Sequence, residues 1–350
     1  MSWKSIIQNV ANKFGYKVTR LPSIYLGQVD ENSSLSQLIN KHGADIVYHM
    51  ATTGKGTDEC MEKGCLPVLT HFYQPIPDLK DLERRGVWDK ISDMRGIEWN
   101  LSKFLNNMSD TMKYTSECYW PSAESLNPME FFNNNFSFGY CDAAILYCMI
   151  RKHKPKRLIE VGSGMSSRVI ANALQTNMSE NSSYDPEYTI IDPYSLIDIS
   201  LFPKGTSLLK QQVEVTDLST FEALSENDIL FIDSSHVCKI GSDVNFEVLE
   251  VLPSLRSGVY VHFHDIVMPY EYPKIFATNP EFRMFWTEDY FLQAFLAFNS
   301  AYEVVLPVSY IFKNSYNKAR SLFPMDVDNE AWGGCSLWLK CVKDSWRDNK

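Results

Sequence analysis

The sequence lacks any run of about 20 uninterrupted apolar residues, the length a membrane-spanning helix requires, so no transmembrane span is predicted. Its first 18 residues lack the continuous apolar core of a signal peptide. The chain also has no internal repeat and no low-complexity linker. These absences favour an ordinary globular chain that is neither membrane-embedded nor built from repeats.

Basic residues are outnumbered, because 33 Lys and Arg stand against 43 Asp and Glu, which gives a formal net charge of -10. No Lys/Arg-rich stripe reverses that balance, so a nucleic-acid partner is disfavoured. The eight cysteines form neither a CxxC pair nor a zinc-like spacing. Several lie inside apolar runs, which favours buried, reduced thiols and a cytoplasmic location. The cysteines are Cys60, Cys65, Cys118, Cys141, Cys148, Cys238, Cys335 and Cys341.

The 350 residues divide by pattern into two parts. Residues 1–125 mix short helical stretches with irregular segments that contain proline, such as 68–78, where two prolines block a regular helix. We interpret this part as an irregular amino-terminal extension on the substrate side. Residues 126–350 are predicted to form the main domain.

The main domain alternates short apolar runs with helical segments, which is typical of a parallel sheet covered by helices on both faces. Strands are predicted at 157–161, 188–191, near 211–215, at 228–232 and at 258–264, and helices at 141–153, 166–174 and about 241–252. The predicted fold class is therefore α/β, doubly wound and Rossmann-like.

The carboxyl-terminal part departs from this alternation. Residues 302–306 and 335–342 both have the composition of strands, and no long helix is predicted between them. A final antiparallel strand pair favours the methyltransferase variant of the doubly wound fold over the dehydrogenase variant.

A glycine turn follows the first predicted strand. Gly162 and Gly164 allow a tight turn and a close approach of a ligand to the backbone. Ser167 occupies the place of the third glycine in a GxGxxG motif, which counts against a pyrophosphate and therefore against NAD. S-adenosylmethionine (SAM) has no phosphate and suits this turn better.

Acidic residues near this turn are candidate ligands of the cofactor. Asp192 ends the next strand and can accept hydrogen bonds from both ribose hydroxyls, or it can simply form a turn before Pro193. Glu160 can bind the methionine end of SAM or act as a structural carboxylate. Asp217 can bind the adenine amine or cap a helix. The predicted cofactor-binding set is Glu160, Gly162, Ser163, Gly164, Ser166, Asp192, Asp217 and Asp233.

Two further strand ends carry polar clusters, 233–236 and 262–265. Alternation along a strand places His262 and His264 on one face, and ligands of this fold gather at the carboxyl ends of the strands. Asp233 and His264 are therefore expected to converge as an acid/base pair or as part of a divalent metal site. His236 is a candidate general base, or else a loop residue without a catalytic role. Tyr270, Tyr272 and Trp286 can line an acceptor lid or serve only in packing.

The segments 157–167, 191–194, 229–236, 261–265, 268–273 and 290–296 resemble a bacterial family of class I SAM-dependent methyltransferases. The segments 136–142 and 71–73 extend the similarity. Members of that family are associated with surface-polysaccharide, other glycan and secondary-metabolite pathways. The resemblance implies methyl transfer from SAM.

Related O-methyltransferases hold magnesium at the same two strand ends. By that similarity Asp233, His264 and Asp265 would be metal ligands, with His264 in the place of an acidic one. Magnesium prefers oxygen, and manganese tolerates imidazole better. The alternatives of a metal-free acid/base pair and of a structural polar network stay open.

The predicted function is O-methylation of a hydroxyl on a sugar or glycan-like acceptor. The alternatives are methylation of a small phenolic or secondary metabolite and, less favoured, an NAD-linked oxidoreductase. Candidate catalytic residues are His236, His264 and Asp233. Assembly into a homo-oligomer is left open by the sequence.

Overall fold

A computed structural model describes residues 34–280, 283–325, 327 and 332–344. The first 18 residues, which lack the pattern of a signal peptide, lie outside these residues. The described chain forms two compact units, one containing residues up to 88 together with 273–285, and the other containing the remainder. The predicted division at 125/126 stays a prediction. No helix within the described ranges combines the length and apolarity needed to cross a membrane.

The first unit holds one helix of 20 residues and three short helices, joined by segments without regular structure. These helices are α2 (Ser34–Thr53), α3 (Thr57–Glu62), α4 (Leu79–Arg84) and α11 (Lys274–Thr278). Asp78 caps α4 by accepting hydrogen bonds from the backbone N atoms of Lys80 and Asp81. The rings of His71, Phe72 and Tyr73 contact one another, and Phe72 and Tyr73 are largely exposed.

The second unit is built on a seven-stranded sheet with the order β3-β2-β1-β4-β5-β7-β6. Strand β7 is antiparallel to both of its neighbours, whereas β3, β2, β1, β4 and β5 are mutually parallel. The strands are β1 (Arg157–Val161), β2 (Glu187–Ile191), β3 (Thr206–Leu209), β4 (Ile229–Ile232), β5 (Tyr260–Phe263), β6 (Tyr302–Pro307) and β7 (Leu337–Cys341). The predicted α/β fold class and the antiparallel carboxyl-terminal pair are confirmed.

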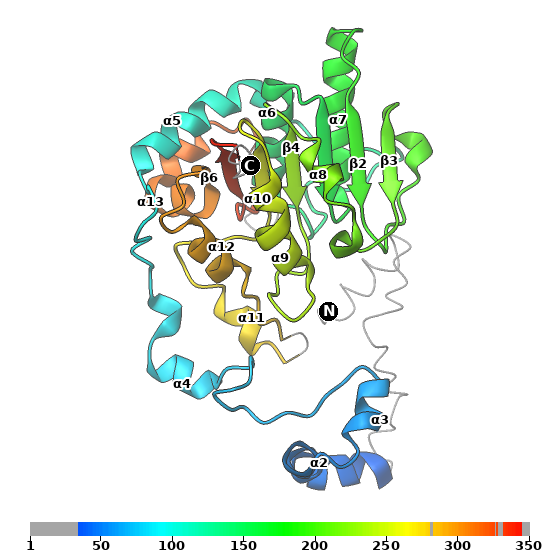
Figure 1. The fold of residues 1–350 in the computed structure, drawn as a ribbon, viewed down its shortest axis with the longest axis vertical. Coiled ribbons are helices and arrows are strands. Elements are labelled where there is room, and N and C mark those ends of the chain that lie inside the picture. The colour runs from blue at the N-terminus through cyan, green and yellow to red at the C-terminus, as the bar shows by residue number, and fades with distance from the viewer. Residues whose placement is uncertain (1–33, 281–282, 326, 328–331, 345–350) are drawn as a thin grey trace, which may run out of the picture. The chain divides into compact units, whose positions relative to one another are not determined.

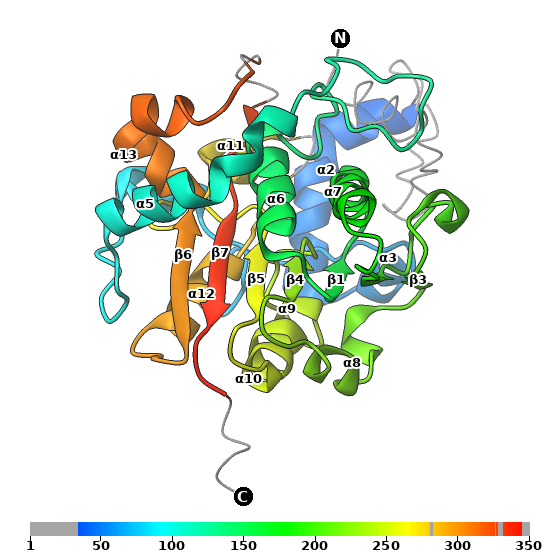
Figure 2. The same cartoon turned by 90° about the horizontal axis from the view of Figure 1, so that it is seen from above.

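Helices cover both faces of this sheet (Figures 1 and 2), with α5, α6 and α7 on one side and α8, α9, α10 and α12 on the other. Strands β4 and β5 are buried along their whole length, as the continuous apolar sequence of β4 indicates, and the buried β5 contains one polar residue, His262. The helical elements of this unit are α5 (Leu101–Thr111), η2 (Met112–Glu117), α6 (Tyr140–His153), α7 (Met165–Glu180), η3 (Ile199–Leu201), η4 (Val213–Val215), α8 (Ser219–Glu222), α9 (Asp243–Phe246), η5 (Glu247–Val251), α10 (Leu252–Ser254), α12 (Glu288–Leu296) and α13 (Val308–Arg320), and η1 (Val87–Asp89) lies where the two units join in sequence.

Two local predictions were wrong. The strand expected near 211–215 is at 206–209, and residues 213–215 form a 3-10 turn instead. A helix, α13, separates β6 from β7, although none was expected there. It begins directly after Pro307 and buries Val308, Ile311 and Phe312 on one face, a helical spacing that the polar residues of 313–318 obscure in the sequence.

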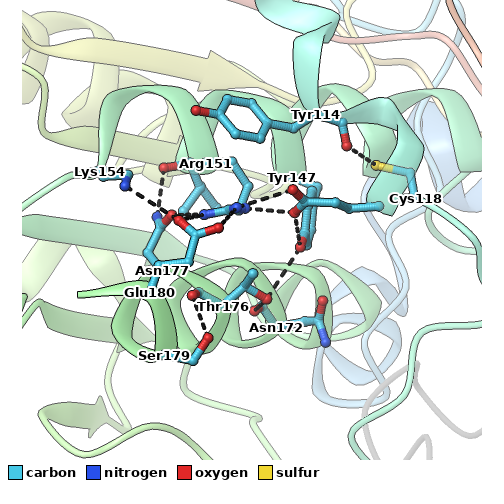
Figure 3. A network of polar contacts seen from close by, with 12 residues as sticks. Tyr114, Cys118, Tyr147, Arg151, Lys154, Asn172, Thr176, Asn177, Ser179 and Glu180 are labelled. Atoms are coloured by element: carbon cyan, nitrogen blue, oxygen red, sulfur yellow. Dashed lines mark hydrogen bonds and ion pairs between the residues drawn. The ribbon is translucent and has the colours of Figure 1, made fainter. Parts of the chain in front are cut away.

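A buried arginine joins α6, α7 and η2 (Figure 3). The Arg151 side chain is almost fully buried, and its Nε lies 2.7 Å from Glu117 Oε2. Its guanidinium also pairs with Glu180 and Asn177 of α7 and lies over the ring of Tyr114. The bridge fixes α7, the helix that follows the glycine turn, against its neighbours.

Candidate active site

The glycine turn lies between β1 and α7, as predicted. Gly162 has φ +80°, in the left-handed region that favours glycine, and its N atom donates to Ile191 O at 3.0 Å. A Cβ on Gly162 would lie 2.1 Å from the carbonyl oxygen of Asp233, whereas a Cβ on Gly164 would meet nothing within 4 Å. The first glycine is therefore required by packing, because the backbones of two strand ends touch there.

Glu160 is fully buried behind this turn. Its Oε1 accepts from Ser166 Oγ at 2.7 Å and its Oε2 from Ser167 Oγ at 2.8 Å and from the Tyr188 hydroxyl. Burial raises the pKa of Glu160 to about 7, against the effect of these three donors. Glu160 and Ser166 thus hold the start of α7, and neither borders the cavity beside the ends of β1, β2 and β4.

A cavity of about 290 Å³ opens beside the ends of β1, β2 and β4. Asp192 borders it, with Oδ2 accepting from Ser163 Oγ at 2.5 Å and Oδ1 from Tyr194 N at 2.8 Å. The lining residues are Val161, Gly162, Ile191, Asp192, Pro193, Tyr194, Gln212, Val213, Glu214, Asp233, Ser234, Ser235 and Asp243. Its position next to the glycine turn suits a nucleoside whose ribose hydroxyls face Asp192.

Of the predicted cofactor-binding residues, Gly162, Asp192 and Asp233 border this cavity. Ser163 does not line the cavity but donates a hydrogen bond to Asp192, which does. Asp217 is not among the lining residues, and its Oδ1 accepts from Ser219 N at the start of α8. Sequence reasoning missed Tyr194, Glu214 and Asp243. Asp243 lies in the helix that follows β4, where its carboxylate accepts from Ser235 N and Oγ, so only the folded chain brings it to the cavity.

Asp233 and Asp265 follow the neighbouring strands β4 and β5 and face two imidazoles. His236 Nε2 lies 3.3 Å from Asp233 Oδ1 and 3.9 Å from Asp265 Oδ2. His264 Nδ1 lies 3.6 Å from each of the same two oxygens. We call these four residues the carboxylate–imidazole cluster. The sequence predicted the convergence of Asp233, His264 and Asp265, and the structure adds His236 to it.

His262 takes no part in the cluster. Its ring is buried and stacks on Trp338, with the ring centroids 4.6 Å apart. Burial lowers the pKa of His262 to about 3. The ring is therefore a neutral element of the core.

Charge in the cluster favours ionised carboxylates beside imidazolium rings. Burial opposes the ionisation of Asp233, but His264 and His236 outweigh that cost and hold the pKa of Asp233 below its usual value. Burial also disfavours the imidazolium of His236, yet Asp233 and Glu288 raise the pKa of His236 to about 10. Asp265 behaves differently, because burial raises its pKa.

Two buried carboxylates from other elements hold the far sides of the two rings. Asp142 of α6 lies 3.9 Å from His264 Nε2, and it also accepts hydrogen bonds from Gly334 N and Ser336 Oγ. Glu288 of α12 lies 2.8 Å from His236 Nδ1. Neither was predicted as a site residue. The sequence did contain a signal for Asp142, which is an acidic residue in an otherwise apolar helical segment. A carboxylate buried there needs charged or hydrogen-bonding partners, so its position indicates a polar site nearby.

The cluster fits a divalent cation. One donor atom each from Asp233, His236 and Asp265 lies within 4.8 Å of the others. His264 Nδ1 is buried, has no hydrogen-bond partner among the described residues, and faces the same two carboxylates. A mixed set of carboxylate and imidazole donors suits manganese or another transition ion better than magnesium.

Residues 159–266 match a family described as a methyltransferase domain, and this segment contains the glycine turn, the cavity and the carboxylate–imidazole cluster. An uncharacterised protein of Archaeoglobus fulgidus is 30% identical over 169 residues, which cover 45% of this chain and 74% of that protein. The chain belongs to this methyltransferase family. Its methyltransferase domain spans residues 159–266.

Two solved structures show remote likeness to this methyltransferase. The SAH-bound methyltransferase PaMTH1 of Podospora anserina is 12% identical, with a TM-score of 0.34, over 68% of this chain and 88% of that one. A protein-L-isoaspartate O-methyltransferase from Plasmodium falciparum, bound to S-adenosyl-L-homocysteine, is 11% identical, with a TM-score of 0.26, over 53% and 81% of the two chains.

Proposed function

We propose that this methyltransferase transfers the methyl group of SAM to a hydroxyl of a sugar or glycan-like acceptor. The observation that carries the proposal is the carboxylate–imidazole cluster beside the cavity. Asp233 borders the cavity and also lies 3.3 Å from His236 Nε2, so a side chain capable of acid/base chemistry lies next to the place proposed for SAM. A hydroxyl needs such a base because an alcohol is a poor nucleophile until it loses its proton.

In the proposed reaction, Asp192 and the glycine turn hold SAM, which supplies an activated methyl group on its sulfonium. A cation held by Asp233 and Asp265 would offset the negative charge that raises the pKa of His236 to about 10, and so would leave its imidazole neutral. The neutral His236 takes the hydroxyl proton, and the acceptor oxygen attacks the methyl carbon in line with the carbon–sulfur bond. The new carbon–oxygen bond forms as that bond breaks, and S-adenosylhomocysteine leaves. Orientation supplies much of the acceleration, because both reactants are held in one geometry.

A divalent cation is part of the proposal, with Asp233, His264 and Asp265 as its ligands. Bound there, a cation would polarise the acceptor hydroxyl and lower its pKa. Asp142, on the far side of His264, would orient that ring, as carboxylates commonly do for metal-binding histidines. The metal-free alternative keeps Asp233 and His264 as an acid/base pair.

Aromatic residues beside His236 support an acceptor with a ring. The ring centroid of Trp286 lies 4.4 Å from that of His236, and Tyr272 packs edge-on against Trp286. Tyr272 is buried, whereas the ring of Trp286 is only half-buried. A partly exposed indole can stack on the apolar face of a sugar, and it also suits a flat phenol. The second candidate function is therefore methylation of a small phenolic metabolite.

The test is a panel of activated sugars, glycan fragments and phenols incubated with radiolabelled SAM and the full chain. Label transferred to a sugar hydroxyl supports the proposal, and transfer to phenols alone supports the second candidate. His236→Ala is expected to lower turnover by about two to four decades while SAM affinity changes by a factor of a few. If His236→Ala keeps normal turnover and His264→Ala alone is inactive without metal dependence, His264 is the base.

A further inference from the structure

Residues 286–289 contact both loops that carry the cluster. Thr287 N and Glu288 N donate hydrogen bonds to the carbonyl oxygen of His236, at 2.9 and 3.2 Å. Glu288 Oε2 lies 2.8 Å from His236 Nδ1, and the Trp286 ring packs against the same imidazole. The beginning of α12 thus holds both the backbone and the ring of His236, a residue 52 positions earlier in the chain.

The neighbouring carboxylate, Asp289, acts on the other loop. Both of its oxygens accept from Val267 N, at 3.3 and 3.1 Å, two residues after Asp265. Asp289 and Glu288 are both buried, at 4% and 1% exposure. Consecutive buried carboxylates therefore have different partners, a backbone amide in one case and the ring of the proposed base in the other.

The contact with His236 accounts for the burial of Glu288. Its second oxygen, Oε1, is buried and has no hydrogen-bond partner within the described part of the chain. Removing a carboxylate from water without a partner is costly, and the His236 ring is the group that offsets this cost through Oε2. A carboxylate with no other hydrogen-bonding role is placed to control that ring.

We infer that Glu288 is a positioning residue for methyl transfer, acting through His236. A carboxylate accepts hydrogen bonds, so Nδ1 must present its N–H to Glu288. The ring is thereby fixed with Nε2 facing Asp233 and Asp265, the side on which the acceptor is proposed to bind. This inference rests on the proposed role of His236 as the base.

A double-mutant cycle tests the inference. Glu288→Gln, His236→Gln and the double variant are compared for turnover with radiolabelled SAM and the best acceptor of the sugar and phenol panel. SAM affinity is measured by calorimetry and stability by thermal unfolding. Glu288→Gln is expected to lower turnover about 10–100-fold in the wild-type background, with SAM affinity changed less than about twofold. In the His236→Gln background it should change turnover less than about twofold, because the ring it positions is absent.

Asp289→Asn is the matched control, since it alters the adjacent buried carboxylate without touching His236. Its effect on turnover is expected to be the same in both His236 backgrounds. An equal loss from Glu288→Gln in both backgrounds would overturn the inference and leave Glu288 as a structural residue.

Crystal structures of the wild type and of Glu288→Ala separate the inference from the proposed function. If His236→Gln keeps full turnover, His236 is not the base. The orientation of the His236 ring in the two crystal structures then tests the positioning role of Glu288 independently of the base. A His236 ring that rotates in Glu288→Ala supports the positioning role. An unmoved ring overturns it. Glu288→Gln preserves the volume of the side chain and serves where Glu288→Ala fails to fold.

Discussion

Gly162 lies directly against the backbone of Asp233, so close that a Cβ on Gly162 would be 2.1 Å from the Asp233 carbonyl oxygen. This contact joins the end of β1 to the end of β4, where Asp233 N also donates to Val161 O at 3.0 Å. The turn proposed to hold the cofactor and the first residue of the carboxylate–imidazole cluster therefore share one backbone contact, and a change at either alters both.

Gly162→Ala is expected to destabilise the fold and to weaken SAM binding. The φ of +80° alone costs about 1–3 kcal/mol for a residue with a side chain, and the clash with a backbone atom adds to it. Gly164→Ala is the control, because its Cβ has open space in the folded chain. Thermal unfolding of both variants measures the difference. Equal melting temperatures for the two variants would contradict the packing argument.

Asp192→Ala is expected to weaken SAM binding by about 1.5–3 kcal/mol, because hydrogen bonds to a charged acceptor are lost. Isothermal calorimetry with SAM measures this, and titration with NAD checks the oxidoreductase alternative.

Asp217→Ala tests the prediction that Asp217 binds the adenine amine of SAM. Because Asp217 accepts a hydrogen bond from Ser219 N at the start of α8 and does not border the cavity, we expect its loss to leave SAM affinity within about twofold. A large loss would assign Asp217 to the cofactor site after all.

Chelation is expected to abolish turnover and to leave SAM binding nearly intact, since two of the three proposed ligands, His264 and Asp265, do not line the cavity. His264→Ala should lose bound metal, measured by atomic emission, together with activity. His153→Ala is a suitable control, because His153 lies at the end of α6, where its ring packs at a tilt against Tyr260, and it does not belong to the cluster. Full activity in excess chelator would favour the metal-free acid/base pair.

The buried Glu160 predicts a pH dependence of stability. The pKa of Glu160 in the folded chain is about 7, above the ordinary value of 4.5. Between pH 4.5 and about pH 7, Glu160 is therefore protonated in the folded chain and ionised in the unfolded chain. Stability from this group is present below pH 4.5 and falls as pH rises to about 7, by about 3 kcal/mol in all. The difference in unfolding free energy between wild type and Glu160→Gln, measured from pH 4 to 8, should show this slope. A constant difference would mean that the pKa is not raised.

The buried Arg151 is expected to contribute strongly to stability. Arg151→Ala removes a buried guanidinium that Glu117, Glu180 and Asn177 surround. We expect the free energy of unfolding to fall by about 2–4 kcal/mol. The loss is limited because water can solvate both glutamates, which are partly exposed. Lys152→Ala on the same helix breaks only an exposed pair with Asp110 and should cost less than about 1 kcal/mol. Chemical denaturation compares the two. Similar losses would show that the network has no special weight.

The sequence by itself predicted the alternation of strands and helices, the glycine turn after β1 and the convergence of Asp233 with His264 and Asp265. These features depend on local chemistry, since apolar periodicity, turn residues and strand ends are written within a few neighbouring positions. Parallel pairing of β4 with β5 then brings the ends of both strands together. The helix α13 escaped prediction because its buried face is short and interrupted by polar residues.

Only the tertiary structure decided the partners of the two imidazoles. Asp142 reaches His264 from α6, and Glu288 reaches His236 from α12, across long separations in sequence. The roles of Glu160 and Asp217 were likewise open in the sequence, and packing directs one to the serines of α7 and the other to the start of α8. A carboxylate's partner depends on which side chains packing brings within hydrogen-bond distance, and residue type and spacing do not contain that information.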